Sequence, residues 1–300
     1  MDHFKEEHKE TIVSSCDLLG VSRQVYYRSI RSTIEKQEVA QKVIALVRPV
    51  RILMPRLGSK KLYHILKEEL VPLKVGRDKL FRILRANHML IKSRRSYHIT
   101  TDSHHRFRKH KNLLCATEIN RPEQVLVSDI TYVGNRRNPA YLALVTDAYS
   151  KVVMGHDVSN SLDVSGSIRA MEMAVKNRCY SDQPLIHHSD RGLQYCSNDY
   201  QKVLDKNNIK PSMTEKYDPY ENAIAERING ILKQEFHIAK YDTDLTTRKK
   251  LIDEAIKIYN HLRPHLSNHM LTPHQMHQQL VLKRKQYKSK KLNNEIIVQL

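Results

Sequence analysis

Three acidic residues occupy positions where a carboxylate could bind a metal ion. Asp129 interrupts the β-branched run 125–133, which is apolar on both faces, so an uncompensated carboxylate there is costly. Asp190 ends the run LIHHSD, at the carboxyl end of a predicted strand, where open α/β sheets tend to bind ligands. Glu226 lies on a predicted helix. Together they suit a site that holds two divalent cations about 3.5–4 Å apart for phosphodiester chemistry. Hard oxygen ligands favour Mg²⁺ or Mn²⁺.

Each acid also has an ordinary interpretation when it is taken singly. An Arg partner or a network of hydrogen-bond donors could compensate Asp129, and Asp190 could simply cap the turn that follows it. Glu226 lies opposite an apolar stripe at 100° per residue, and most glutamates on such a face are solvated. The polar residues on its side of the helix are Asn222, Asn229 and Lys233.

The segments around these acids alternate between strand and helix patterns after Pro122. The predicted strands cover 124–133, 141–149, 151–158, 184–190 and 209–213. The predicted helices cover about 162–178, the segment through 200–204, 221–237 and 246–262. Three strands in succession, followed by alternation, predict a mixed sheet covered by helices.

Two helix-turn-helix patterns precede this region. The first covers 9–30, where Gly20 is suited to end one helix and Ser22 to cap the next. The second covers two apolar stripes, at 62–70 and 80–84, separated by Pro72. A helical hairpin that only packs is the alternative in each case. The side chains predicted to contact DNA from these segments are Arg23, Tyr27, Lys60, Lys61, Arg77, Arg82, Arg94 and Arg95.

Composition favours a polyanionic partner. The formal net charge is +19, although a basic surface kept for solubility remains the alternative. Residues 92–111 keep this charge and lose apolar periodicity, which indicates a linker along DNA phosphates or a solvated spacer. The four cysteines, Cys16, Cys115, Cys179 and Cys196, stand singly, which argues against zinc fingers and a disulfide scaffold and fits a reducing cytoplasm. No apolar run approaches the length of a membrane helix, and the charged start is not a secretory signal.

Three sequence blocks resemble the DDE transposases of the insertion-sequence-3 family, second-frame (orfB) product. They are LVSDITYV, HHSDRGLQY and ENAIAERINGILKQEF, and thirty-five residues stand between Asp190 and Glu226, as in the DD(35)E group. YHILKEELVPLKVGRDKLFRILRANHML is similar to the family's helix-turn-helix ahead of the core, and IYNHLRPHLSNHMLTPHQ to its closing segment.

The resemblance implies an α/β, ribonuclease-H-like fold like that of retroviral integrases. Its five-stranded mixed sheet would be flanked by helices and preceded by all-α helix-turn-helix regions. The expected divisions are 1–45 and 46–100 (helix-turn-helix), 101–120 (basic linker), 121–282 (catalytic core) and 283–300 (basic tail). Asp129, Asp190 and Glu226 would be the metal-binding catalytic triad, and Asp147 would be structural. The residues expected around the triad are His188, Ser189, Gly192, Gln194, Tyr195 and Asn222, with Lys233 reaching DNA.

The activity that the resemblance implies is transposition in a bacterial cytoplasm, in association with the nucleoid. We expect two Mg²⁺ ions per site, with Mn²⁺ as a substitute, double-stranded DNA as element ends and target, and a homo-multimer. No leucine-zipper heptads precede the core. The upstream-frame helix-turn-helix and leucine-zipper product is therefore an expected fusion or partner. The alternatives are a catalytically inert DNA-binding regulator and a ribonuclease of the same fold.

Overall fold

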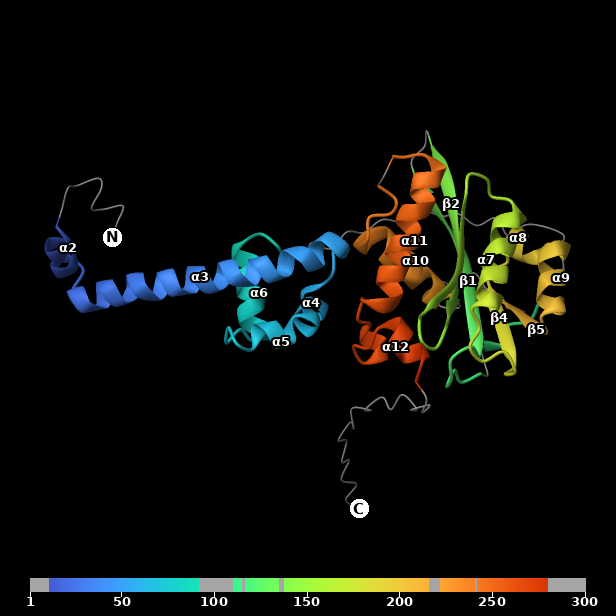
Figure 1. Cartoon of the computed structure of the whole chain (residues 1–300), viewed down its shortest axis with the longest axis horizontal. Helices are drawn as coiled ribbons and strands as arrows, with labels where there is room; N and C mark the ends of the chain where they lie inside the picture. Colours follow the sequence, from blue (N-terminus) through green and yellow to red (C-terminus); the bar gives the residue numbers. More distant parts are fainter. Residues whose placement is uncertain are drawn as a thin grey trace, which may run out of the picture. The chain divides into compact units, whose positions relative to one another are not determined.

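A computed structural model of the chain describes residues 11–91, 110–114, 117–134, 138–215, 222–240 and 242–279. The chain divides into two compact units, Met1–Arg95 and Ser96–Leu300, and each unit is described by itself (Figure 1). No helix within these ranges is long and apolar enough to cross a membrane. Arg94, Arg95, most of the predicted basic linker and the predicted tail over 283–300 lie outside the described residues.

The first unit begins with the predicted helix pair. Helix α2 (Ile12–Leu18) ends before Gly20, whose φ of 63° is the left-handed conformation that glycine adopts readily. Ser22 then accepts a hydrogen bond from the backbone N–H of Val25 and caps α3 (Arg23–Leu53). The division expected between residues 45 and 46 falls inside α3. One helix continues across that segment, with Pro49 inside it.

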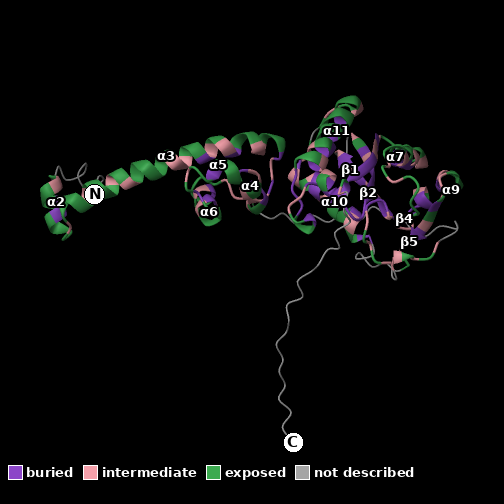
Figure 2. Ribbon diagram, turned by 60° about the horizontal axis from the view of Figure 1, so that its bottom comes forward, coloured by how far each residue is buried: buried purple, intermediate pink, exposed green. Residues whose placement is uncertain are grey.

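The second half of α3 packs with three shorter helices. These are α4 (Ser59–Ile65), α5 (Lys67–Leu70) and α6 (Arg77–Ala86). Val43 and Val47 of α3 are fully buried, as are Leu62 of α4 and Leu80 and Leu84 of α6. Figure 2 colours the buried stretches of these helices purple, beside the second half of α3. The apolar stripes predicted over 62–70 and 80–84 therefore form the core of this unit.

The second unit is built on one mixed sheet with the order β3-β2-β1-β4-β5. The strands are β1 (Val125–Gly134), β2 (Pro139–Asp147), β3 (Val153–Ser159), β4 (Leu185–Ser189) and β5 (Ile209–Met213). The first three form an antiparallel meander, and β4 and β5 continue the sheet from β1 in parallel. Both the predicted strands and the ribonuclease-H-like fold class are confirmed.

Helices cover both faces of this sheet (Figure 1). On one face lie α7 (Val164–Lys176), α8 (Leu193–Cys196) and α9 (Asn198–Lys206), and their apolar side chains share a core with Leu126 of β1. On the other lie α10 (Ala223–Glu235) and α11 (Leu245–His261), followed by η2 (Leu266–Asn268) and α12 (Pro273–His277). Val125 and Val127 pack with Ala225 of α10. Since side chains alternate along a strand, Asp129 faces α10 as well.

Candidate active site

Asp129 lies in the middle of β1, the central strand, and is partly buried. The side-chain amide of Asn229, on α10, donates a hydrogen bond of 2.7 Å to Asp129 Oδ2. Burial raises the pKa of Asp129 to about 7, and the negative charges of Asp190 and Glu226 raise it further against the opposing effect of Asn229. A donor therefore orients this carboxylate, and none of the ion pairs found among the described residues includes it.

Asp190 directly follows β4, the strand that pairs in parallel with β1. Val127 is the register partner of His188, so Asp129 and Asp190 each lie two residues beyond that pair toward the carboxyl ends of the two strands. Asp190 Oδ1 accepts a hydrogen bond of 3.0 Å from the backbone N–H of Gly192. The turn-capping interpretation of Asp190 is therefore correct.

Glu226 projects from the first turns of α10 and is exposed. Burial of part of its side chain raises its pKa, and so does the charge of Asp190. The polar stripe beside it faces the sheet, because Asn222 and Asn229 are buried. Asn222 Nδ2 donates to the carbonyl oxygen of Ser128 at 3.1 Å. The sequence alone left open that Glu226 lies on a solvated face of the helix. Asn222 and Asn229, on the same side, are not solvated.

Lys233 completes the attachment of α10 to β1. Its ammonium donates to Thr131 Oγ1 at 3.1 Å, one turn of helix beyond the contact between Asn229 and Asp129. Burial lowers the pKa of Lys233, and the charge of Asp129 opposes that shift. Asn222, Asn229 and Lys233 thus contact β1 at residues 128, 129 and 131. These contacts set the position of Glu226 on α10.

The oxygen donors around this site fit hard divalent cations. Asp190 raises the pKa of both other acids, so the three carboxylates lie close enough to repel one another. Bound cations would remove that repulsion. Among the described residues, the carboxylate oxygens of these three acids do not all lie within 4.8 Å of one another. Three ligands shared between two ions about 3.5–4 Å apart need not do so.

Two of the residues expected around Asp190, His188 and Ser189, end β4 directly before it. His188 is buried, and its Nδ1 is 2.9 Å from Ser212 Oγ, while Ser189 Oγ donates to the carbonyl oxygen of Asp190. His187 was not predicted to have a role, but its Nε2 is 2.8 Å from Ser128 Oγ. Burial lowers the pKa of His187 to about 3, so this ring is neutral and part of the packing.

Other members of the family blocks have structural contacts. Asp147 is fully buried and accepts hydrogen bonds from the backbone N–H groups of Glu123 and Ser150, as its expected structural role requires. In the closing segment, Asn260 bonds both the N–H and the carbonyl oxygen of Val153. These contacts join α11 to β3. Only hydrogen-bond capacity signalled them in the sequence, because the partners are distant along the chain.

The candidate DNA-binding side chains of the first unit are mostly exposed. Those on its helices that face solvent are Arg23, Tyr27, Lys60, Arg77 and Arg82. Lys61 differs, because only 8% of it is exposed. Its aliphatic stem therefore belongs to the helical core, and we leave it out of the proposed DNA-binding set.

Comparison with known proteins agrees with this architecture. Residues 119–219 and 207–273 match two families that are both described as the integrase core domain. Among solved structures, the HTLV-2 integrase catalytic core domain in complex with magnesium is similar, with a TM-score of 0.42 and 21% identity over 52% of this chain and 97% of that chain.

Two relatives are proteins of bacterial insertion sequences. The 31 kDa protein of insertion element IS600 from Shigella sonnei is 32% identical over 257 residues, which cover 83% of this chain and 92% of that protein. Transposase InsF for insertion sequence IS3A from Escherichia coli K12 is 38% identical over 114 residues, 38% of this chain and 39% of that protein. With the sheet order and the integrase core matches, these similarities place the chain in the insertion-sequence-3 family of DDE transposases, which are DNA-cleaving polynucleotidyl transferases.

Proposed function

We propose that this transposase binds the ends of its insertion sequence and carries out Mg²⁺-dependent strand cleavage followed by strand transfer. Water would first cut one strand, and the freed 3′-hydroxyl would then attack a second phosphodiester. Asp129, Asp190 and Glu226 would hold two Mg²⁺ ions, with Mn²⁺ as a substitute. The observation that carries the proposal is the closeness of these three carboxylates, whose charges raise the pKa of Asp129 and of Glu226, beside the parallel pair β1 and β4.

The residues of this chain would act mainly by positioning. Asn229 holds Asp129 through one carboxylate oxygen, and the Gly192 N–H holds Asp190 in the same way. These donors fix the orientation of both carboxylates. Two divalent cations in such a site activate the attacking oxygen and stabilise the leaving one. A β-carbon at residue 192 would stand 3.0 Å from Asp190 Oδ1, so glycine keeps this contact unobstructed.

The test replaces each acid by its amide: Asp129→Asn, Asp190→Asn and Glu226→Gln. We expect each variant to lose cleavage and joining of element-end DNA by at least about 10³-fold, because the cations lose a charged ligand. Binding of the same DNA in a gel-shift assay should change little. Asp199→Asn is the matched control, since Asp199 is exposed and pairs only with Lys202 among the contacts described for it.

Near-normal joining by one of the three variants would remove that residue from the proposed triad. The inert-regulator alternative makes a different prediction, namely that supercoiled or end-containing DNA is bound by the wild type with Mn²⁺ but never nicked. Preferential cleavage of RNA–DNA hybrids would favour the ribonuclease alternative.

We further propose that the exposed basic residues of the first unit bind the element ends. Arg23, Lys60, Arg77 and Arg82 would contact phosphates or base edges, with Tyr27 beside them. Arg94, Arg95 and Lys233 would extend this contact toward the core. A homo-multimer would hold two ends together, and the upstream-frame product would join it as a fusion or partner. Sedimentation of the protein with and without end DNA tests the multimer.

A further inference from the structure

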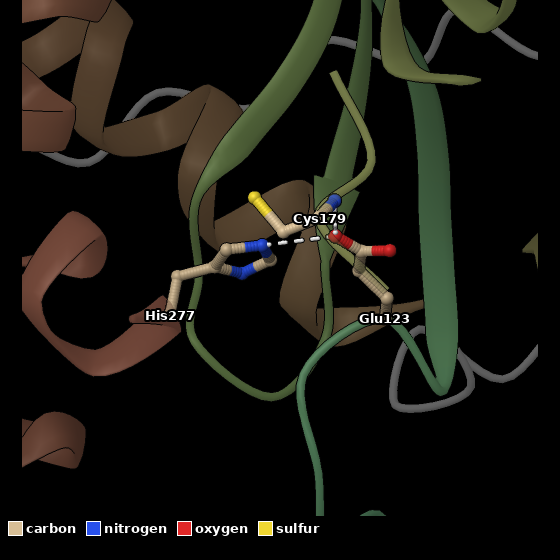
Figure 3. Close-up of side chains that lie close together, drawn as sticks. All are labelled: Glu123, Cys179 and His277. Carbon is tan, nitrogen blue, oxygen red and sulfur yellow. Dashed lines mark hydrogen bonds and ion pairs between the residues drawn. The ribbon is translucent and has the colours of Figure 1, made fainter. Parts of the chain in front are cut away.

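A second group of metal-binding side chain types lies apart from the three catalytic acids. Glu123 precedes β1, Cys179 follows α7, and His277 ends α12, so that three distant segments supply one side chain each (Figure 3). One ligand atom of each lies within 4.8 Å of the others. Glu123 and His277 are buried, while Cys179 is exposed.

The distances inside this group match those of a tetrahedral zinc site. His277 Nε2 is 3.2 Å from Glu123 Oε1. Two ligand atoms on one tetrahedral zinc ion, each about 2.0–2.1 Å from it, are about 3.3 Å apart. The Cys179 side chain is exposed and its sulfur takes part in none of the hydrogen bonds described around Glu123, so a small rotation could bring the sulfur to bonding distance. Solvent would supply the fourth ligand.

The other nitrogen of the His277 ring is already held in the way that zinc sites require. His277 Nδ1 lies 3.0 Å from Ser150 Oγ and 3.5 Å from Asp147 Oδ2, and Ser150 Oγ donates to Asp147 Oδ2. A metal-bound histidine nearly always makes such a contact with a carboxylate or hydroxyl through its second ring nitrogen, and this contact fixes the orientation of the ring.

The backbone already holds Glu123 at the junction of these segments. Its Oε1 accepts a hydrogen bond of 2.6 Å from the backbone N–H of Cys179, and its Oε2 lies 3.2 Å from the guanidinium of Arg178. On binding a divalent cation, the Cys179 thiol would release its proton, because the thiolate is the form that binds metal.

From this geometry we infer that Glu123, Cys179 and His277 form a zinc site that fastens α12 to the start of β1 and to the end of α7. The Cys/His/carboxylate donor set is softer than the all-oxygen set of the three catalytic acids, so it selects Zn²⁺ over Mg²⁺. Its role is structural, because α12 belongs to the segment that closes the catalytic unit.

The test adds Co²⁺, as a spectroscopic substitute for zinc, to the full-length protein in excess Mg²⁺. The excess Mg²⁺ keeps the hard oxygen site from contributing. We expect a thiolate-to-cobalt charge-transfer band that Zn²⁺ abolishes. Zinc at a hundredfold excess over its dissociation constant should raise the unfolding temperature by roughly 5 °C.

Cys179→Ser is the decisive variant. It should remove the cobalt band and the thermal shift without unfolding the protein, because Glu123 is bonded by the backbone N–H of Cys179 and not by its sulfur. Cys115→Ser is the matched control and should leave the band unchanged, as should Asp129→Asn. The inference is overturned if no thiolate band forms or if the band persists in Cys179→Ser. Neither readout uses DNA cleavage, so it is independent of the proposed catalytic chemistry.

Discussion

Asp129 is held in a site that opposes its ionisation. Its neighbours are two further acids and an amide donor, and no cationic group bonds it among the described contacts. Such an arrangement lowers the stability of the metal-free protein and is typical of functional sites. Metal binding therefore competes with a proton at this residue. The chemistry of the site and its effect on folding follow from the same repulsion.

Replacing Asp129 by Asn should stabilise the metal-free protein in a pH-dependent way. A folded-state pKa of about 7, above the ordinary value near 4, means that ionised Asp129 destabilises the fold fully above pH 7 and not at all near pH 4. The variant should gain on the order of 4 kcal/mol at pH 8 and much less than 1 kcal/mol at pH 4. Thermal unfolding with a chelator measures this, and a gain that does not change with pH would contradict it.

The Asn229→Ala variant should weaken catalysis without touching a metal ligand. It removes the donor that orients Asp129 Oδ2, so the apparent affinity for Mg²⁺ should fall about 10–100-fold. Higher Mn²⁺ should restore much of the cleavage rate, and end binding should be unchanged. Asn207→Ala, which removes a helix-end amide bonded to Val203, serves as control. Equal loss in both variants would mean that Asn229 acts through stability alone.

At the scale of elements, close packing of helices on the sheet places the acids. Helix α7 approaches β3 so closely at Gly155 that a β-carbon there would meet the carbonyl oxygen of Ala170 at 1.9 Å. On the other face, polar contacts from α10 to β1 set the position of Glu226. One face of the sheet therefore depends on the fit of apolar surfaces, and the other on directed hydrogen bonds.

Two glycine substitutions test this difference. Gly155→Ala should lower the free energy of unfolding by about 3 kcal/mol, because the obstructing atoms are backbone and have little freedom to move. Gly230→Ala lies inside α10 with nothing within 4 Å of the new carbon, so it should raise stability by about 0.5–1 kcal/mol. Urea unfolding of both variants gives the two values. Similar effects of the two would disprove the close approach at Gly155.

At the scale of the whole molecule, the net charge of +19 is shared between two units that carry different candidate roles. The first presents exposed cations on helices, and the second holds the acidic site. The positive net charge attracts DNA. The cluster of carboxylates repels the DNA phosphates unless cations neutralise it. Sequence-independent attraction and metal-dependent chemistry can therefore be measured separately.

Two neighbouring lysines allow the contact with DNA phosphates to be tested by the salt dependence of binding. Lys60 is exposed and Lys61 is buried, so Lys60→Met should reduce the slope of log K against log salt for end binding by about 0.9. Lys61→Met should leave that slope unchanged, provided that circular dichroism shows the same helix content. An unchanged slope in Lys60→Met would exclude a phosphate contact at this residue.

Much of the fold was accessible from the sequence, because its signals are local. Short runs rich in β-branched residues predicted the five strands, and Gly20 and Ser22 correctly marked the end of one helix and the start of the next. The division at residue 45 was misplaced for the same reason: short-range patterns identified two helical motifs but not the single helix that joins them. Local sequence patterns predict where helices and strands form, and they predict less well where these elements end.

The sequence by itself singled out Asp129, Asp190 and Glu226 as the candidate acids, together with the oxygen chemistry that carboxylates can support, since both predictions follow from residue type and spacing. Only the tertiary structure decided that the polar stripe of α10 faces β1 and that Asn229 orients Asp129 across 100 residues. It also brought His277 to Glu123 across 154 residues. Contacts of this kind depend on how whole surfaces pack, and no short stretch of sequence records which distant partner a side chain will meet.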